Sequence, residues 1–245
     1  MSLIPSLEAT TLKVSIVIPA INEERGIGKT IDAIHTASFA KHHWDLEIVL
    51  VDGDSKDRTR EIASKKGAVV IIEKRRGYGR AYKTGLAQAT GDIIVTGDAD
   101  ATYPFDRIHE YIELLLDAKL DFITTDRFAE LKHGSMTLKH RFGNLVLAVT
   151  LNVLFVTSIK DSQSGMWIFR RAALEKIQPL EAFNDGMPFS EELKIEMFTT
   201  HGLKTREIPS TLYAREGQVK LESFKDGIKN LKFLFKNRVT PRKKG

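Results

Sequence analysis

Three acidic clusters in the sequence could hold a cation. They are Asn22-Glu23-Glu24, Asp52-Gly53-Asp54 and Asp98-Ala99-Asp100, and each follows a short apolar run of strand length. Massed carboxylates repel one another unless a positive charge lies between them. Carboxylate oxygens suit Mg²⁺ or Mn²⁺, commonly together with substrate phosphates. Any single cluster fits a solvated turn, but three at successive strand ends predict a divalent cation in one shared cleft.

A second chemical feature is the glycine-containing basic segment 73–81. Gly77 and Gly79 precede a predicted helix, and Lys74, Arg75, Arg76 and Arg80 lie around them. Free N–H groups at a helix N-terminus favour a diphosphate, and basic side chains add to this attraction. The alternative is a solvated basic face. The segment does not match the dinucleotide-binding pattern, because the third glycine is missing.

The elements that must position these groups alternate between strand and helix. Continuous apolar runs predict strands, and apolar residues three or four apart predict helices. The predicted strands are 14–20, 47–51, 69–72, 92–96 and 121–125, and the predicted helices are 23–37, 57–66, 79–89 and 105–118. Such a series predicts a parallel sheet covered on both faces, with ligands at the carboxyl ends of its strands. The predicted fold class is α/β, doubly wound.

The alternation changes after residue 128. An apolar helix is predicted at 142–156, a strand at 166–169, a helix at 191–200 and a short strand at 206–209. We interpret the chain as an N-terminal extension (1–12), one domain with a C-terminal elaboration (13–221), and a basic amphipathic helix and tail (222–245).

Composition narrows the class of protein. The 245 residues are 42% hydrophobic and 28% charged, which is ordinary for a globular protein and excludes disorder and collagen-like repeats. The absence of cysteine excludes disulfides, thiolate zinc sites and cysteine nucleophiles. The formal charge of +5 is uneven, because residues 215–245 carry +7 and the rest −2. A nucleic-acid partner is therefore not expected, since such a domain spreads its basic residues over one face.

The sequence predicts contact with a membrane without a membrane span. Residues 1–12 do not resemble a signal peptide, and the longest apolar run, 145–156, is shorter than the ~20 residues of a spanning helix. That run predicts either a buried helix or a membrane-facing lip. Within 222–245, an apolar stripe borders a basic one, which favours an interfacial helix over an anionic membrane; a helix docked on the domain is the alternative. The two stripes are Phe224, Ile228, Leu231 and Phe235, and Lys225, Lys229, Lys232 and Lys236.

Several motifs, taken in order, resemble the family 2 glycosyltransferases with the GT-A fold. They are Val17-Ile18-Pro19-Ala20-Ile21-Asn22-Glu23, Val51-Asp52-Gly53-Asp54-Ser55-Lys56-Asp57 and Asp98-Ala99-Asp100-Ala101-Thr102-Tyr103-Pro104. Asp161-Ser162-Gln163-Ser164-Gly165-Met166 and Arg215-Glu216-Gly217 look like the branch of dolichyl-phosphate mannose synthases and other polyprenyl-phosphate glycosyltransferases. The resemblance implies a mostly parallel GT-A sheet with a Rossmann-like N-terminal half and a C-terminal, acceptor-side elaboration.

The resemblance also implies roles for individual residues. Asp98 and Asp100 would place Mg²⁺ or Mn²⁺ on the donor diphosphate, and Asp52 would contact the base or ribose. The nucleotide-sugar site implied in this way comprises Pro19, Ala20, Glu23, Asp52, Gly77, Asp98, Ala99, Asp100, Arg127, Arg215 and Lys220. Asp100, Arg127 and Asp161 are the expected catalytic residues.

This chain departs from the family pattern at two positions. Thr102 stands where mannose synthases commonly have Gln, which leaves glucose or another hexose open as the donor sugar. Asp54 stands in a motif that is often Asp-Asp-Gly-Ser, so its contact is undetermined. The Gln-x-x-Arg-Trp signature of processive synthases is absent, which argues against polymer synthesis.

The acceptor decides whether a general base is needed. A lipid monophosphate is already anionic near neutral pH, so Arg127, Arg215 and Lys220 need only position it and neutralise charge. A sugar hydroxyl requires a carboxylate base, for which Asp161, Glu191 and Glu192 are candidates.

The leading hypothesis is an inverting transfer of a hexose from a nucleotide-sugar to a dolichyl or polyprenyl phosphate. The enzyme would be peripheral, on the cytoplasmic face of a membrane. The alternatives are transfer to a soluble or saccharide hydroxyl, and a regulatory protein that binds a nucleotide without catalysis. The sequence predicts no oligomeric state.

Overall fold

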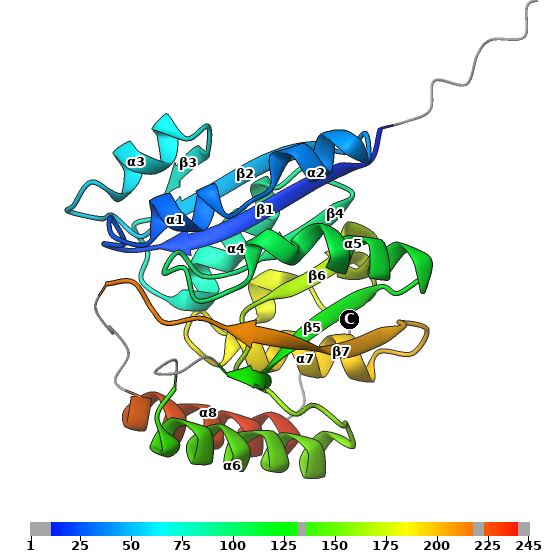
Figure 1. Ribbon diagram of the computed structural model, residues 1–245. Coiled ribbons are helices and arrows are strands. Elements are labelled where there is room, and N and C mark those ends of the chain that lie inside the picture. The colour runs from blue at the N-terminus through cyan, green and yellow to red at the C-terminus, as the bar shows by residue number, and fades with distance from the viewer. Residues whose placement is uncertain (1–10, 132–135, 218–222, 240–245) are drawn as a thin grey trace, which may run out of the picture.

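The fold is built on seven strands, which are drawn as arrows in Figure 1. They are β1 (Lys13–Ala20), β2 (Asp45–Asp52), β3 (Val69–Ile72), β4 (Ile93–Thr96), β5 (Phe122–Leu131), β6 (Trp167–Arg170) and β7 (Thr205–Leu212). In the computed structural model, which describes residues 11–131, 136–217 and 223–239, these strands form one sheet in the order β3-β2-β1-β4-β6-β5-β7. Only β6 runs antiparallel to its neighbours, so the sheet is mostly parallel, as expected.

Eight α-helices and three short 3₁₀ turns connect the strands within the described residues. The helices are α1 (Ile27–Asp32), α2 (Thr36–Lys41), α3 (Thr59–Lys65), α4 (Tyr78–Gln88), α5 (Ile108–Asp117), α6 (Leu138–Phe155), α7 (Phe189–Thr199) and α8 (Ser223–Val239). The helix predicted at 23–37 is instead a turn followed by two helices. The amides of Gly26 and Ile27 both donate to the carbonyl of Glu23, and the chain leaves the helical conformation at His35.

The sheet separates two apolar cores, because side chains of a strand alternate between its faces. Ile16 and Ile18 of β1 point into the core that α1 and α5 cover. Val17 points the other way, toward α4 and α7, where it packs with Tyr82 and Phe189. This double covering explains why the predicted strands are continuously apolar.

A third cluster joins the C-terminal helices beneath the sheet, where α6 and α8 lie side by side (Figure 1). Leu151 of α6 and Leu234 of α8 are fully buried in it, and Leu231 packs against it. Helix α8 is therefore docked on the protein, while Ile228 and Phe235 remain exposed. The side chains of Phe224 and Lys225 lie outside the described residues.

We also searched the helices for a membrane span. Across the three described stretches of chain, none combines the length and the apolar content needed to cross a bilayer.

Candidate functional site

The carboxyl ends of β2, β1 and β4 lie next to one another, because these strands pair in parallel. Asp52 ends β2, Glu23 follows β1, and Asp98 and Asp100 follow β4. The predicted convergence of the acidic clusters at one edge of the sheet is confirmed for Glu23 and Asp100, which share one ion-pair partner.

The loop after β4 holds Asp98 and Asp100 in a tightly packed turn. Gly26 lies against it so closely that an added Cβ would come 2.5 Å from the carbonyl oxygen of Ala99. Asp100 is almost fully buried, and its Oδ1 accepts hydrogen bonds from the amide (3.1 Å) and hydroxyl (2.6 Å) of Thr102. Thr102 therefore orients Asp100, a role that the sequence did not indicate.

Asp98 and Asp100 repel each other electrostatically. Desolvation raises the pKa of Asp98 to about 7, and the negative charge of Asp100 adds to this effect. A carboxylate pair strained in this way fits a hard divalent cation. Within the described residues, no group of three or more His, Cys, Asp or Glu side chains is placed to hold a metal ion.

The positive charge between the acids in this structure is Arg215. Its Nη1 contacts Oδ2 of Asp100, and its Nη2 lies 2.6 Å from Oε1 of Glu23. The backbone next to Arg215 is also bonded to the loop after β4, since the amide of Glu216 donates to the carbonyl of Asp100 (3.0 Å). The guanidinium therefore contacts Asp100, one of the two carboxylates that the sequence predicts to hold a metal ion.

Only one of the two carboxylate oxygens of Asp52 accepts hydrogen bonds within the described chain. Its Oδ1 accepts from the amide of Ser55 (2.8 Å) and from Arg60 (3.3 Å). Its Oδ2 is fully buried and has no hydrogen-bond partner among the described residues. A buried acceptor without a donor is costly, so this oxygen fits an N–H or O–H group of a nucleoside. Pro19 and Ala20 pair in register with Val51 and Asp52 beside it.

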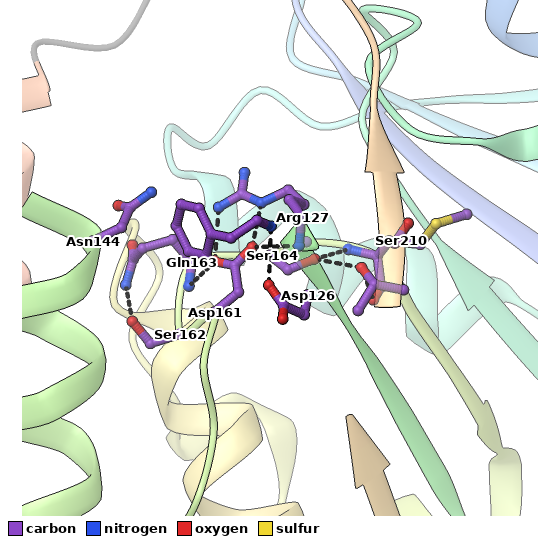
Figure 2. A network of polar contacts seen from close by, with 12 residues as sticks. Asp126, Arg127, Asn144, Asp161, Ser162, Gln163, Ser164 and Ser210 are labelled. Atoms are coloured by element: carbon purple, nitrogen blue, oxygen red, sulfur yellow. Dashed lines mark hydrogen bonds and ion pairs between the residues drawn. The ribbon is translucent and has the colours of Figure 1, made fainter. Parts of the chain in front are cut away.

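Arg127 and Asp161 form a buried ion pair on the other side of the cleft (Figure 2). Arg127 lies in β5, and Asp161 lies in the loop between α6 and β6. The guanidinium bonds both carboxylate oxygens, at 2.6 Å and 2.9 Å, and the amides of Arg127 and Gln163 also donate to Asp161. Burial alone would raise the pKa of Asp161, but Arg127 outweighs it and holds that pKa below its usual value.

Gln163 connects this loop to two helices. Its amide nitrogen donates to Oε1 of Glu191 in α7 (2.6 Å) and to the hydroxyl of Ser162, and its oxygen accepts from Asn230 of α8 (2.8 Å). Burial raises the pKa of Glu191 to about 8. Lys194 of α7 donates to the carbonyls of Asp161 and Ser162. The Asp161 loop is therefore held from below by α7 and α8.

An open groove of about 740 Å³ begins beside Arg127. Asp126 and Phe128, which flank Arg127 in the sequence, line one end. The wall is mostly apolar and comes from α6, with Arg141 and Lys160 at its edges. The groove therefore begins next to the Arg127–Asp161 ion pair and runs along α6.

Comparison with known families decides the affiliation of the chain. Residues 15–178, well over half of the chain, match the sequence model described as glycosyl transferase family 2. The chain belongs to that family.

Two curated relatives of this glycosyltransferase come from Haloferax volcanii. The low-salt glycan biosynthesis hexosyltransferase Agl6 is 36% identical over 91% of this chain but 53% of its own length, so the chain spans about half of that relative. A dolichyl-phosphate hexose transferase is 32% identical over 90% of this chain and 91% of its own length.

Solved structures support the fold of the glycosyltransferase. Glucosyl-3-phosphoglycerate synthase from Mycobacterium tuberculosis, in complex with Mn²⁺, UDP-glucose and phosphoglyceric acid, superimposes with a TM-score of 0.72. The match covers 93% of this chain and 79% of that chain at 21% identity. The fold is GT-A, and the family match assigns the chain to the glycosyltransferase class of enzymes.

The structure places Gly77 of the glycosyltransferase differently from the expected diphosphate cradle. Gly77 caps α4 against Asp185, with a φ of 140°, and the amides of Gly79 and Arg80 already donate to the carbonyls of Gly186 and Asp185. The basic side chain of Arg80 is paired with Glu181 and Asp185 as well. A contact between Gly77 and the nucleotide stays a prediction that these bonds do not favour.

Three further residues complete the comparison with the sequence. Lys220 lies outside the described residues. Asp54 adopts a left-handed conformation and forms ion pairs with Lys56 and Arg60 near the surface. Gln163 lies in one of the family motifs, but its role in connecting the Asp161 loop to α7 and α8 was not predicted. Its partners, Glu191 and Asn230, lie 28 and 67 residues away in the sequence.

Proposed function

We propose that the enzyme transfers a hexose, with inversion, from a nucleotide-sugar to a dolichyl or other polyprenyl phosphate. The observation that most favours a phosphate acceptor is the hydrogen bonding and lowered pKa of Asp161. Its two oxygens are occupied by Arg127 and its pKa is lowered, so it fits the role of an anchor for Arg127 and does not fit that of a general base.

The other two candidate bases are also engaged. Glu191 is fully buried, with Oε1 bonded to Gln163 and Oε2 without a hydrogen-bond partner in the described chain. Glu192 is buried and accepts from the amide of Asn184 (2.7 Å). A sugar hydroxyl would need one of these carboxylates to take its proton. A phosphate oxygen needs no base, and Arg127 supplies a cation where such a phosphate would approach.

On the donor side, we propose that Asp98 and Asp100 hold Mg²⁺ or Mn²⁺ with the diphosphate. The bound cation would offset the charge that develops on the leaving nucleoside diphosphate. Asp52 would accept a hydrogen bond from the nucleoside through its orphaned Oδ2. Pro19, Ala20 and Glu23 would line the nucleotide pocket, Ala99 would form the floor of the loop between the two metal ligands, and Arg215 would contact the phosphates.

The relatives support this proposal without deciding the sugar. One is named a dolichyl-phosphate hexose transferase, a more distant one a dolichol-phosphate mannosyltransferase from Pyrococcus furiosus, and another a human dolichyl-phosphate beta-glucosyltransferase. GDP-mannose and UDP-glucose are therefore both donors to test. A lipid acceptor would bring the reaction to a membrane surface, and we propose the cytoplasmic face of that membrane, with the enzyme bound peripherally.

The test is transfer of label from nucleotide-sugars to a short-chain polyprenyl phosphate in detergent. We expect label in the organic phase, loss of transfer in Asp100→Ala, and retention in the control Asp54→Ala, whose acid is paired near the surface. Label that stays only in water-soluble products would refute the lipid acceptor. Undiminished transfer by Asp100→Ala would refute the metal assignment.

A further inference from the structure

Helix α6 exposes a continuous apolar stripe. The side chains recur every three or four residues, so they lie along one side of the helix. Val156, just past the helix, extends the line with a left-handed backbone (φ 56°) that a β-branched residue rarely adopts. We call this stripe the α6 face; its members are Leu138 (79% exposed), Phe142 (69%), Leu145 (56%), Val149 (52%), Val153 (74%) and Val156 (89%).

The opposite side of α6 is committed to the protein interior. Leu147, Ala148 and Leu151 are buried, and two of them pack in the cluster that α7 and α8 share. The helix is therefore apolar on both sides, which is typical of a helix buried on both sides. No residue of the described chain covers the α6 face, which leaves it open to contact with another body.

The side chains around the α6 face are basic, which favours an anionic partner. Helix α6 has no acidic residue and carries Lys139 and Arg141 in its first turn. Its neighbour α8 adds exposed lysines, and the exposed Ile228 and Phe235 lie among them. A second copy meeting this surface about a two-fold axis would place basic residues against basic residues. An anionic lipid surface is complementary both to the exposed apolar side chains and to the basic residues around them.

The α6 face is also continuous with the groove beside Arg127. Phe142, Leu145 and Val149 belong to the face and line the groove at the same time. A lipid chain leaving a bilayer along these residues would reach Phe128 and bring its head group to Arg127. Leu138, Val153 and Val156 are part of the face but not of the groove.

We propose that the α6 face inserts into the interfacial region of an anionic bilayer and opens the groove toward the lipid. The use of the groove rests on the proposed function, whereas insertion of the face can be measured without any reaction. The C-terminal helix α8 contributes basic residues beside the inserted helix. The buried Leu234 and the partly buried Leu231 hold it against α6.

The test uses sedimentation of the full chain with vesicles. We expect binding to vesicles of phosphatidylcholine with 30% phosphatidylglycerol, and at least tenfold weaker binding to pure phosphatidylcholine. The double variant Leu138→Glu/Val153→Glu should lose at least tenfold in binding to anionic vesicles, because both side chains are exposed and lie outside the groove. The matched control is Val69→Glu/Ile72→Glu, which alters two exposed apolar residues of β3 and should bind like the wild type.

Two outcomes would overturn the proposal: wild type that does not sediment with anionic vesicles, or a double variant that binds them as the wild type does. A wild-type dimer that the double variant dissociates, with unchanged vesicle binding, would assign the face to a second copy instead. Transfer to polyprenyl phosphate in detergent separates the two proposals. Transfer without vesicle binding refutes insertion alone, and vesicle binding without transfer refutes the proposed function alone.

Discussion

Replacing Arg215 by Met should tighten the binding of Mn²⁺ to the nucleotide-free enzyme. Arg215 contacts Asp100, a proposed metal ligand, and also Glu23. Its positive charge therefore offsets the negative charge that would otherwise attract a metal ion to these carboxylates. A metal ion must displace this guanidinium before it can bind Asp100. We expect the displaced Arg215 to contact the donor diphosphate, so the same variant should bind nucleotide-sugar more weakly.

The magnitude follows from the charges. Two unit charges about 4 Å apart interact by about 4 kcal/mol at an effective dielectric constant of about 20. The side chain of Arg215 is one-quarter exposed, and solvent screens such pairs toward about 1 kcal/mol. A net competition of about 1–2 kcal/mol corresponds to an increase of roughly 5- to 30-fold in Mn²⁺ affinity.

The assay is a titration of free Mn²⁺ followed by electron paramagnetic resonance, without nucleotide. Arg107→Met is the matched control, because Arg107 pairs with Glu110 on α5 and should leave Mn²⁺ affinity unchanged. If Arg215→Met binds Mn²⁺ no more tightly than the wild type, Arg215 does not compete with the metal for Asp100.

Three other perturbations test the described contacts. Asp161→Asn leaves Arg127 with an unpaired buried charge, so the free energy of unfolding measured in urea should fall by about 3–5 kcal/mol. A decrease below about 1 kcal/mol would mean that the ion pair is not buried as described. Folded Glu191, with a pKa of about 8, keeps a proton that the unfolded chain releases near pH 4.5, so the free energy of unfolding should fall as pH rises between these values, by at most about 1.4 kcal/mol per unit. Glu191→Gln should flatten this dependence, and an unchanged slope would contradict the raised pKa. Gly26→Ala places a Cβ 2.5 Å from the carbonyl oxygen of Ala99, so calorimetry should show a lower Tm, whereas Gly143→Ala, with nothing within 4 Å, should be neutral or stabilising; equal Tm values for the two variants would contradict the close approach.

The sheet was predictable because buried parallel strands have a local signature. Apolar runs predicted most of the strands, and β3 matches its predicted bounds of 69–72. The strand predicted at 206–209 is short and partly charged, and it forms part of β7. The antiparallel direction of β6 had no such signature, since a run of four residues looks the same in either direction. The break between α1 and α2 was also missed, because it depends on the non-helical backbone at His35, which residue types do not reveal.

The site was only partly predictable for a related reason. The position of Asp98 and Asp100 at the edge of the sheet was predictable, because the motif follows the end of a strand. The contact of Arg215 with Asp100 joins residues 115 positions apart, and that with Glu23 joins residues 192 apart. Local patterns carry no information on such pairings. The apolar run of α6 from residue 142 onward was visible in the sequence, but which side of the helix faces outward depends on where α7 and α8 pack.

The hydrogen bond from Asn230 to Gln163 has a consequence for building chimeric enzymes. A designer who exchanges acceptor specificity between relatives would choose the loop that carries Asp161 and retain the recipient's own C-terminal helix. That helix supplies the amide that fixes Gln163, and its Leu234 fills the cluster below the loop. The loop and α8 therefore form one transplantable unit, although more than fifty residues separate them in the chain.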